Sequence, residues 1–199
     1  MPDLKRRIIE IAIKNKQSHA GSALSSVDII ERIYREKKKE DIFILSCGHA
    51  FLALAVVLEV YEGKNAEELV KKHGIHATRD EDNGIWCSTG SLGNGIGIAL
   101  GTAIAQPNKK IYCLVSDGET CEGAFWEVLR IASELDIRNL FIKVSCNGFG
   151  GMQAINIHQL KKQINGFGFN GIEVIKTSNY PLPETLDAHY LIPDEKIFF

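Results

Sequence analysis

The chain has 199 residues, 45% of them hydrophobic, which predicts one α/β domain with a sizeable core over residues 1–199. Its 23 basic and 25 acidic residues nearly balance, so we expect neither a nucleic acid nor an anionic membrane as a partner, and no apolar run reaches transmembrane length. Five cysteines without a CxxC pair, and an amino terminus without a secretory pattern, are typical of a cytoplasmic protein.

Two helices are expected in the amino-terminal part. Residues 3–17 carry apolar side chains at helical spacing and form an amphipathic helix. A loop around His19 follows, and Ser25 and Ser26 are candidate caps for a second helix over residues 27–37. On the residues alone, His19 is either a bystander in this loop or a ligand contact, because its small neighbours let a ligand approach.

A strand, a turn and a helix come next. Residues 42–45, IFIL, are apolar throughout, as in a buried parallel strand. The turn at 46–49 opens a helix over residues 50–61, and the free N–H groups at such a helix start readily bind phosphate. His49 lies at this start, where it either caps the helix or contacts a ligand.

A short helix over residues 65–73 leads into an irregular loop that contains His76. Such a loop is either disordered or a functional lid. The glycine-rich run 88–95, STGSLGNG, then opens a helix over residues 96–105. By itself a glycine-rich loop is a weak signal for phosphate binding. The glycines and alanines of this helix would allow close packing against the sheet or a partner subunit.

The most informative stretch, residues 110–151, indicates a strand, a turn, a helix, a second strand and a second turn. The strands end at polar turns that contain Asp117 and Asn147. Because the carboxyl ends of parallel strands meet at one edge of a sheet, we expect both side chains in one crevice. A carboxylate and an amide oxygen suit Mg²⁺, a cation usually shared with phosphate oxygens. The stretch therefore predicts a cradle for a metal and a diphosphate.

The carboxyl-terminal part carries less signal. We expect a helix over residues 153–165 and a strand over 171–176. The segment 177–199 has three prolines and little periodicity, so it is expected to be irregular and to wrap the surface or a partner.

The spacing within the central stretch resembles a known cofactor motif. Asp117-Gly118, then Glu122-Gly123, then Asn147 resemble the thiamine diphosphate binding motif, and the version with Glu127 and Arg-Asn-Leu at 138–140 resembles the transketolase family. Four motif blocks between residues 5 and 151 follow the family's order. The resemblance implies the thiamine diphosphate-binding fold, an α/β fold with a mostly parallel central sheet flanked by helices on both faces. Ser116 departs from the family, which usually has glycine there.

The resemblance also implies roles for individual residues. Three residues would shuttle protons and bind sugar hydroxyls, namely His19, His49 and His76, while Glu122 would link paired active sites at a subunit interface. Contacts to thiamine diphosphate would come from His49, Gly90, Leu92, Asp117, Gly118, Glu119 and Asn147. Mg²⁺, for which Ca²⁺ or Mn²⁺ could substitute, would be held by the side chains of Asp117 and Asn147 and the main-chain carbonyl of Phe149.

The glutamate that hydrogen-bonds the pyrimidine ring of the cofactor and so activates it is not among these residues. In the family it comes from a separate pyrimidine-binding domain, and no segment here matches that domain. We therefore expect one subunit of a split transketolase-like enzyme, with two copies each of this chain and of a partner that carries the pyrimidine and carboxyl-terminal domains. The implied reaction moves a two-carbon ketol unit from a ketose or ketose phosphate to an aldose. Neither His158 nor His189 lies in a recognisable context for the family's downstream histidine, which weakens the inference to standard pentose-phosphate substrates.

Three other interpretations compete with this one. The chain could be the α-subunit of another thiamine diphosphate enzyme, of the 2-oxoacid dehydrogenase or decarboxylase type, but the histidines at 19, 49 and 76 follow the ketol-transfer pattern. It could be a non-catalytic cofactor-binding or regulatory module. A generic Rossmann-type nucleotide protein fits poorly, because no GxGxxG follows the first strand with an acidic residue at the right distance.

Overall fold

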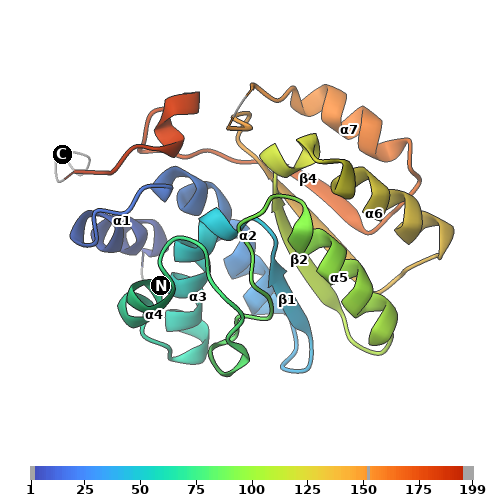
Figure 1. Ribbon diagram of the computed structural model, residues 1–199, viewed down its shortest axis with the longest axis horizontal. Helices are drawn as coiled ribbons and strands as arrows, with labels where there is room; N and C mark the ends of the chain where they lie inside the picture. Colours follow the sequence, from blue (N-terminus) through green and yellow to red (C-terminus); the bar gives the residue numbers. More distant parts are fainter. Residues whose placement is uncertain (1–2, 152, 195–199) are drawn as a thin grey trace.

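A four-stranded parallel sheet forms the centre of the computed structural model, which describes residues 3–151 and 153–194 (Figure 1). The strands lie in the order β1-β2-β3-β4 and all pairs are parallel. Their bounds are Ile42–Leu45, Ile111–Ser116, Leu140–Cys146 and Ile172–Lys176. Helices cover both faces of the sheet, so the predicted fold class is confirmed.

Alternate residues of the strands enter two different cores. Phe43 and Leu45 pack in the core on one face, whereas Ile42 and Ile44 pack in the core on the other. Successive side chains of a strand point to opposite faces, so a strand covered on both faces must be apolar at every position. The run IFIL meets this requirement, which explains why it forms a buried strand.

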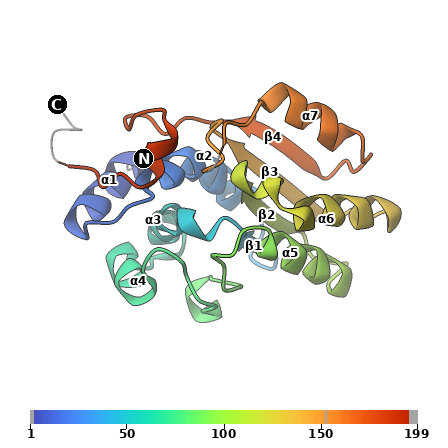
Figure 2. The same cartoon turned by 45° about the horizontal axis from the view of Figure 1, so that its top comes forward.

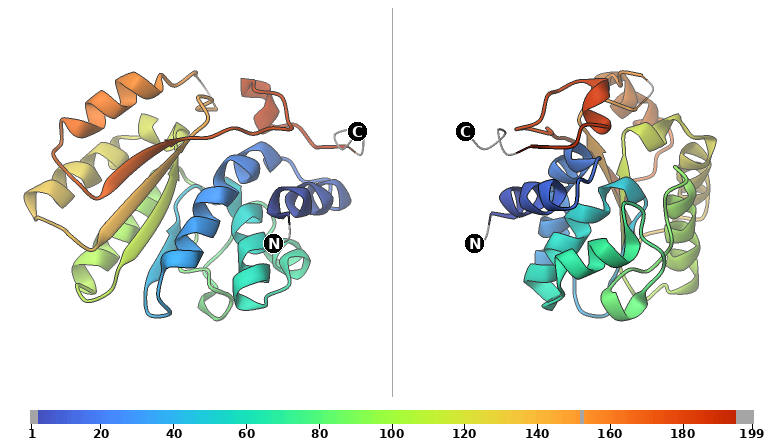
Figure 3. Two further views of the ribbon diagram at one scale, coloured as in Figure 1. Left: turned by 180° about the vertical axis from the view of Figure 1, so that it is seen from behind. Right: turned by 60° about the vertical axis from the view of Figure 1, so that its left-hand side comes forward.

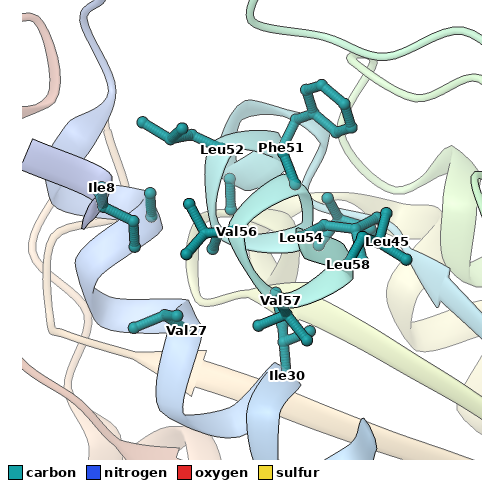
Figure 4. Close-up of a cluster of buried hydrophobic side chains, with 14 of the residues drawn as sticks. Ile8, Val27, Ile30, Leu45, Phe51, Leu52, Leu54, Val56, Val57 and Leu58 are labelled. Atoms are coloured by element: carbon teal, nitrogen blue, oxygen red, sulfur yellow. The ribbon is translucent and has the colours of Figure 1, made fainter. Parts of the chain in front are cut away.

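Four helices contribute to the core on the first face (Figure 2). Their bounds are α1 Leu4–Lys14, α2 Ala20–Glu36, α3 Phe51–Glu62 and α4 Ala66–His73. Helix α3 is buried on all sides over residues 51–58, as expected for a helix that is hydrophobic all round. Figure 4 shows its side chains surrounded by Ile8 of α1, by Val27 and Ile30 of α2, and by Leu45 of β1.

Three helices cover the second face. They are α5 Asn94–Ala105, α6 Gly123–Glu134 and α7 Ile157–Asn165. Short 3₁₀ helices lie in the connections: η1 Gly48–Ala50, η2 Glu81–Asn83, η3 Gly118–Cys121 and η4 Leu186–His189. Among the described residues no helix is long and apolar enough to cross a membrane, and all five cysteines are free.

One predicted boundary was wrong by seven residues. Helix α2 begins at Ala20 and not at Val27, so Ser25 and Ser26 lie inside the helix and do not cap it. Ser25 Oγ donates to the carbonyl of Ser22, a bond made within the helix. Ala20 and its apolar neighbours one turn later are fully buried, and this packing extends the helix toward the amino terminus.

The segment 177–194 has no strand or α-helix, and residues 195–199 of the predicted irregular segment lie outside the described residues. Figure 3 shows it leaving β4 and crossing over the amino-terminal end of α2. Its 3₁₀ helix η4 contacts α2. The segment therefore lies at the edge of the sheet where the carboxyl ends of the strands are found.

Candidate functional site

A cavity of about 210 Å³ opens at the carboxyl ends of β1, β2 and β3. Parallel α/β sheets bind ligands at this edge, where free main-chain groups and polar turns converge. The cavity is lined by four histidines, five serines, an aspartate, an asparagine and several small or apolar residues: His19, His49, His76, His189, Ser22, Ser25, Ser26, Ser116, Ser145, Asp117, Asn147, Gly90, Leu92, Gly118, Phe149, Gly150 and Gly151.

Nine of the eleven predicted site residues line this cavity, and Glu119 and Glu122 do not. The pairing of β2 with β3 explains why Asp117 and Asn147 meet. Ser116 pairs with Ser145 in the parallel register, so the turns that follow the two strands are neighbours. Asp117 Oδ2 accepts the N–H of Gly148 at 2.8 Å, a contact that joins the two turns directly.

Asp117 is a buried carboxylate without a basic neighbour in the cavity. It is 3% exposed, its oxygens accept the N–H groups of Gly118 and Gly148, and neither lysine nor arginine occurs among the described residues that line the cavity. Burial is the largest influence on the group and raises the pKa of the carboxyl above its usual value. A cation placed beside Asp117 would offset this cost, so the site fits a bound cation.

The donors available for such a cation are mixed. Asn147 Oδ1 accepts the N–H of Phe149 at 2.9 Å, which fixes the amide beside Asp117 in the cavity wall. Within the described ranges no three His, Cys, Asp or Glu side chains are grouped to hold a metal. The predicted magnesium set contains only one residue of those types, since its other members are an amide and a main-chain carbonyl. Hard cations such as Mg²⁺ accept oxygen donors of this kind and keep several waters.

Four histidines from four separate segments form another part of the cavity wall. His19 precedes α2, His49 lies in η1, His76 lies in the loop after α4, and His189 lies in η4. The ring centroid of His19 is 6.1 Å from those of His49 and His76 and 4.3 Å from that of His189. The predicted trio is thus assembled in one place, and a fourth histidine joins it.

Three of these histidines, His19, His49 and His189, are held in the neutral form. Burial, reinforced by the neighbouring histidines, lowers the pKa of His19 to about 4 and that of His49 to about 3. Burial likewise lowers the pKa of His189, with His76 as a second cause. A neutral imidazole has one N–H donor and one acceptor nitrogen. The wall can therefore both donate hydrogen bonds to, and accept protons from, a polar ligand at neutral pH.

His189 has no counterpart in the sequence-based site. Its sequence context does not mark it as a downstream histidine, and neither does that of His158, which lies exposed at the start of α7, outside the cavity. His189 enters the cavity because the segment 177–194 turns back over α2. The main-chain N–H of His19 donates to the carbonyl of His189 at 3.1 Å, and no spacing in the sequence indicates such a contact.

The glycine-rich loop packs directly against the turn that carries His49. Gly90 has φ of +147°, which favours glycine, and a Cβ at Gly48 would lie 2.9 Å from the nitrogen of Gly90. A Cβ at Gly95 would lie only 2.5 Å from the Cα of Ser46. These close approaches place Gly90 and Leu92 in the cavity wall beside His49.

Glu119 lies behind the cavity and holds its loops together. It is fully buried, and its two oxygens accept Ser46 Oγ at 2.5 Å, the N–H of Gly93 at 3.1 Å and the N–H of Ser116 at 2.9 Å. Three loops, after β1, before α5 and after β2, are thereby tied to one carboxylate. The structure therefore does not place Glu119 in contact with a ligand in the cavity, because its side chain is fully buried and does not line the cavity.

Glu122, the other residue outside the cavity, is exposed at the start of α6. Its Cβ lies 3.0 Å from the position that a Cβ on Gly93 would take, so it borders the glycine-rich loop from the outer side. This position is accessible to another protein chain, as its expected role requires.

Ser116 offers a polar atom whose hydrogen-bonding capacity is unused. Its Oγ is buried and has no hydrogen-bond partner, although the residue lines the cavity next to Asp117. Buried hydroxyls are normally paired, so this hydroxyl, which lies near the Glu119 carboxylate, is available to donate to a ligand oxygen. A Cβ at Gly118 would lie 2.9 Å from the carbonyl oxygen of Gly150, so glycine is needed for this narrow approach. Main-chain groups and a free hydroxyl suit the oxygens of a diphosphate.

Comparison with known proteins identifies the family of the chain. Residues 5–180 match the family model described as transketolase, thiamine diphosphate binding domain. The chain is 28% identical to one of the subunits of an apulose-4-phosphate transketolase from Phocaeicola vulgatus, over 85% of this chain and 69% of that protein. It is 29% identical to the subunit of the same name from Actinobacillus succinogenes, over 70% of this chain and 58% of that protein. Human transketolase is 31% identical, with 78% of this chain but only 29% of its own length covered.

Solved structures agree on the fold. A transketolase from Campylobacter jejuni superposes with a TM-score of 0.73 at 19% identity, over 98% of this chain and 40% of that one. A transketolase from Pichia stipitis gives 0.76 at 18% identity, over 96% and 38%. This chain thus spans less than half of each solved transketolase. On the match over residues 5–180, the chain belongs to the family of transketolase thiamine diphosphate-binding domains.

Proposed function

We propose that this chain is the diphosphate-binding subunit of a split transketolase, which moves a two-carbon ketol unit from a ketose or ketose phosphate to an aldose acceptor. The observation that carries the proposal is that His19, His49 and His76 line the same cavity as the turns of Asp117 and Asn147.

The cofactor would be thiamine diphosphate with Mg²⁺. Asp117, Asn147 and the carbonyl of Phe149 would hold the cation, while Gly90, Gly118 and Ser116 would contact the diphosphate. When bound, thiamine diphosphate supplies the carbanion chemistry by which carbon–carbon bonds of sugars are cleaved and formed. The buried carboxylate of Asp117, the absence of lysine and arginine among the described lining residues and the unpaired Ser116 hydroxyl all fit this cation and diphosphate.

The histidines would handle the protons of the sugar substrates. Ser18 Oγ and His19 Nδ1 lie 2.7 Å apart, which leaves Nε2 of His19 as the ring nitrogen for a substrate hydroxyl. His49 is the residue most strongly held neutral, with a pKa of about 3, so it suits donation of a hydrogen bond more than storage of a proton. His76 is exposed at the rim, where it can meet an arriving sugar.

A partner chain would complete the site. No glutamate occurs among the described residues that line the cavity. The partner would therefore bring the glutamate that activates the cofactor, as part of a pyrimidine-binding domain. Both bacterial relatives are named as single subunits of a transketolase, which supports the expectation of a second chain, and two copies of each chain is the assembly that we propose.

Helix α5 provides a face for this partner. Ile98 and Ile104 are 42% and 49% exposed, and Gly97 and Gly101 lie on the same side of the helix. A Cβ at either glycine would meet no atom within 4 Å, in contrast to Gly95, so packing inside this chain does not require them. Glycine in a helix interior costs about 1 kcal/mol relative to alanine. We propose that these glycines are retained because they let the backbone of the partner chain approach α5 closely.

The test is reconstitution with the partner subunit. Assays would compare ketose donors and 2-oxoacids, with thiamine diphosphate and Mg²⁺ present and with this chain alone as a control. We expect ketol transfer from a ketose by the complex and none by the isolated chain. Turnover of 2-oxoacids only would instead indicate a dehydrogenase or decarboxylase subunit, and absence of cofactor binding by the complex would indicate a non-catalytic module.

A further inference from the structure

The loop that carries His76 is held at several points, but not at His76 itself. Among the described residues, His76 makes no main-chain hydrogen bond. Its imidazole packs on the main chain of Gly90, since a Cβ on that glycine would lie 3.3 Å from both Cγ and Cδ2 of the ring. The place of His76 in the cavity wall therefore depends on what holds the residues that follow it in the chain.

The segment directly after His76 is attached on one side to the start of the glycine-rich run. The N–H of Thr89 donates to the carbonyl of Ala77 at 3.3 Å, and the N–H of Arg79 donates to Ser88 Oγ at 2.9 Å. Ala77 is also 4% exposed and packs in the core on the first face. These contacts hold alternate residues of the segment, so the side chains of the residues between them need another partner.

His73, the last residue of α4, binds the side chains of those intervening residues. Its Nδ1 lies 3.2 Å from Thr78 Oγ1, and its Nε2 lies 3.1 Å from Asp80 Oδ2. The side chain of His73 is 2% exposed, so both ring nitrogens are buried and both have partners. The ring thereby joins the end of α4 to the second and the fourth residue after His76.

The chemistry of the two partners fixes the direction of these hydrogen bonds. The hydrogen bond from Lys72 is the largest of the causes that lower the pKa of Asp80 to about 2, so the carboxylate is ionised and can only accept. Nε2 of His73 must therefore donate to Asp80. In a ring that carries one proton, Nδ1 then accepts the hydroxyl proton of Thr78. A single imidazole thus satisfies an acceptor and a donor on the same segment.

The ring of His73 also contacts the helix whose start carries His49. It packs edge-on against the ring of Phe51, with 5.6 Å between the centroids. Phe51 is fully buried and is the first residue of α3, two positions after His49. His73 does not line the cavity, but it contacts two of the segments that bring histidines to the cavity wall.

We propose that His73 is a positioning residue, which fixes the loop of His76 through Thr78 and Asp80 and so holds the imidazole of His76 at the cavity wall. The proposal rests on the proposed function, in which His76 meets the sugar substrate. Because His73 lies outside the cavity, it would act only through His76. Its loss should impair the use of the sugar and leave the binding of thiamine diphosphate unchanged.

The first experiment uses the reconstituted complex with His73→Phe, Thr78→Val and, as a control, His158→Gln, which changes an exposed histidine outside the cavity. Phenylalanine keeps a ring to pack against Phe51 but has no nitrogen, and valine keeps the shape of threonine without its hydroxyl. We expect kcat/KM for the ketose to fall by about tenfold or more in His73→Phe, since an ångström of misplacement can cost about a hundredfold. Thr78→Val, which removes one of the two contacts, should cause a smaller fall. Affinity for thiamine diphosphate should change by less than about threefold, and His158→Gln should match the wild type.

Combination with His76→Ala separates positioning from a general effect on the fold. In the His76→Ala background, His73→Phe should cause no further loss of kcat/KM, because the residue through which it acts is gone. Equal losses in both backgrounds would overturn the proposal, and so would unchanged kcat/KM in His73→Phe or an equally large loss of cofactor affinity. If His73→Phe does not fold, Thr78→Val carries the same test, because Thr78 is exposed and its effect should also vanish in the His76→Ala background.

A readout without turnover separates this proposal from the proposed function. In the full chain without its partner, hydrogen exchange of the bonded amides of Arg79 and Asp80 reports how firmly the loop is held. Exchange at these amides should become about tenfold faster in His73→Phe and stay at the wild-type rate in His158→Gln. If exchange accelerated but the complex showed no ketol transfer, the positioning contact would stand and the proposed function would fall. Unchanged exchange in His73→Phe would exclude the contact.

Discussion

The two walls of the cavity are built in different ways. The diphosphate wall, formed by the turns of Asp117 and Asn147, comes from one continuous stretch of strand, helix and strand. The histidine wall comes from four segments that meet only in the folded chain, at residues 19, 49, 76 and 189. A local motif thus fixes where the ligand is anchored, whereas tertiary packing fixes which protons can move beside it.

The electrostatics of the walls differ in the same way. Burial raises the pKa of Asp117 and lowers the pKa of His19 and His49. Burial therefore disfavours the negative charge of the carboxylate on the first wall and the positive charge of the imidazoles on the second. A bound cation would satisfy the carboxylate, while the histidines would remain neutral. Changes to the diphosphate wall should therefore affect binding, and changes to the histidine wall should affect turnover and the dependence of stability on pH.

The largest effect is expected from Asp117→Asn. The amide keeps the shape of the side chain but removes the negative charge that would attract the cation. We expect magnesium-dependent affinity of the complex for thiamine diphosphate to fall by about a hundredfold or more, because even residues behind metal ligands contribute about ten- to a hundredfold. Calorimetry of the complex would measure this. Unchanged affinity would exclude Asp117 as the residue that binds the cation. It would also contradict the expectation that changes to the diphosphate wall affect binding.

Most of the diphosphate wall could be predicted from the sequence, because its chemistry follows strand ends that pair in a fixed register. The strands at 42–45 and 111–116 were recognisable from their apolar runs. His189 was not predictable, because its place depends on the buried anchors Leu182 and Ala188 and not on a local pattern. Glu119 shows the opposite error: the family resemblance implied contact with the cofactor, but Glu119 lies in the 3₁₀ helix η3 and its carboxylate binds Ser46, Gly93 and Ser116 behind the wall.

Glu119→Gln should have the next largest effect, now on stability. The amide keeps one acceptor oxygen, so at least one of the buried donors at Ser46, Gly93 and Ser116 loses its acceptor. A buried unsatisfied polar group costs about 1–3 kcal/mol, and the free energy of unfolding should fall by this amount in urea titrations. Glu122→Gln is the matched control, because Glu122 is exposed and its substitution should leave stability unchanged. Equal effects of the two changes would contradict the loop-holding role of Glu119.

The pH dependence of stability should come from the histidine wall. The folded pKa of His19, about 4, and of His49, about 3, lie below the unfolded value of 6.5, so the neutral forms favour the fold. Their contribution is complete above pH 6.5 and is lost as pH falls toward 4 and 3. Asp117 and Glu119, whose pKa values are raised, act in the opposite direction on acidification.

Comparison of the wild type with His49→Gln isolates the histidine contribution, because both proteins keep the two carboxylates. Urea titrations between about pH 7.5 and 5 should show a smaller loss of stability on acidification in the variant. A parallel pair of curves would mean that His49 is as readily protonated in the fold as in the unfolded chain.

Replacing a glycine of α5 by alanine should change the free energy of unfolding by about 1 kcal/mol. Gly97→Ala and Gly101→Ala add a methyl group that meets no atom of this chain, so each should raise the free energy of unfolding by about that amount. The same methyl groups should weaken association with the partner subunit, which sedimentation or calorimetry would measure. A gain of stability with unchanged association would show that α5 does not belong to the interface with the partner subunit.

The smallest effect is expected from Ser116→Gly, which restores the residue usual in the family. If the orphaned Ser116 hydroxyl donates to a diphosphate oxygen, its removal should weaken thiamine diphosphate binding by about two- to tenfold, the equivalent of a single hydrogen bond of about 0.5–1.5 kcal/mol. Ser116→Ala separates this from crowding, because it keeps the Cβ but lacks the hydroxyl. Weaker binding in both variants would support hydrogen bonding. Tighter binding in Ser116→Gly alone would show that the Cβ crowds the cofactor, so that this position of the diphosphate wall would be an obstacle and not a contact.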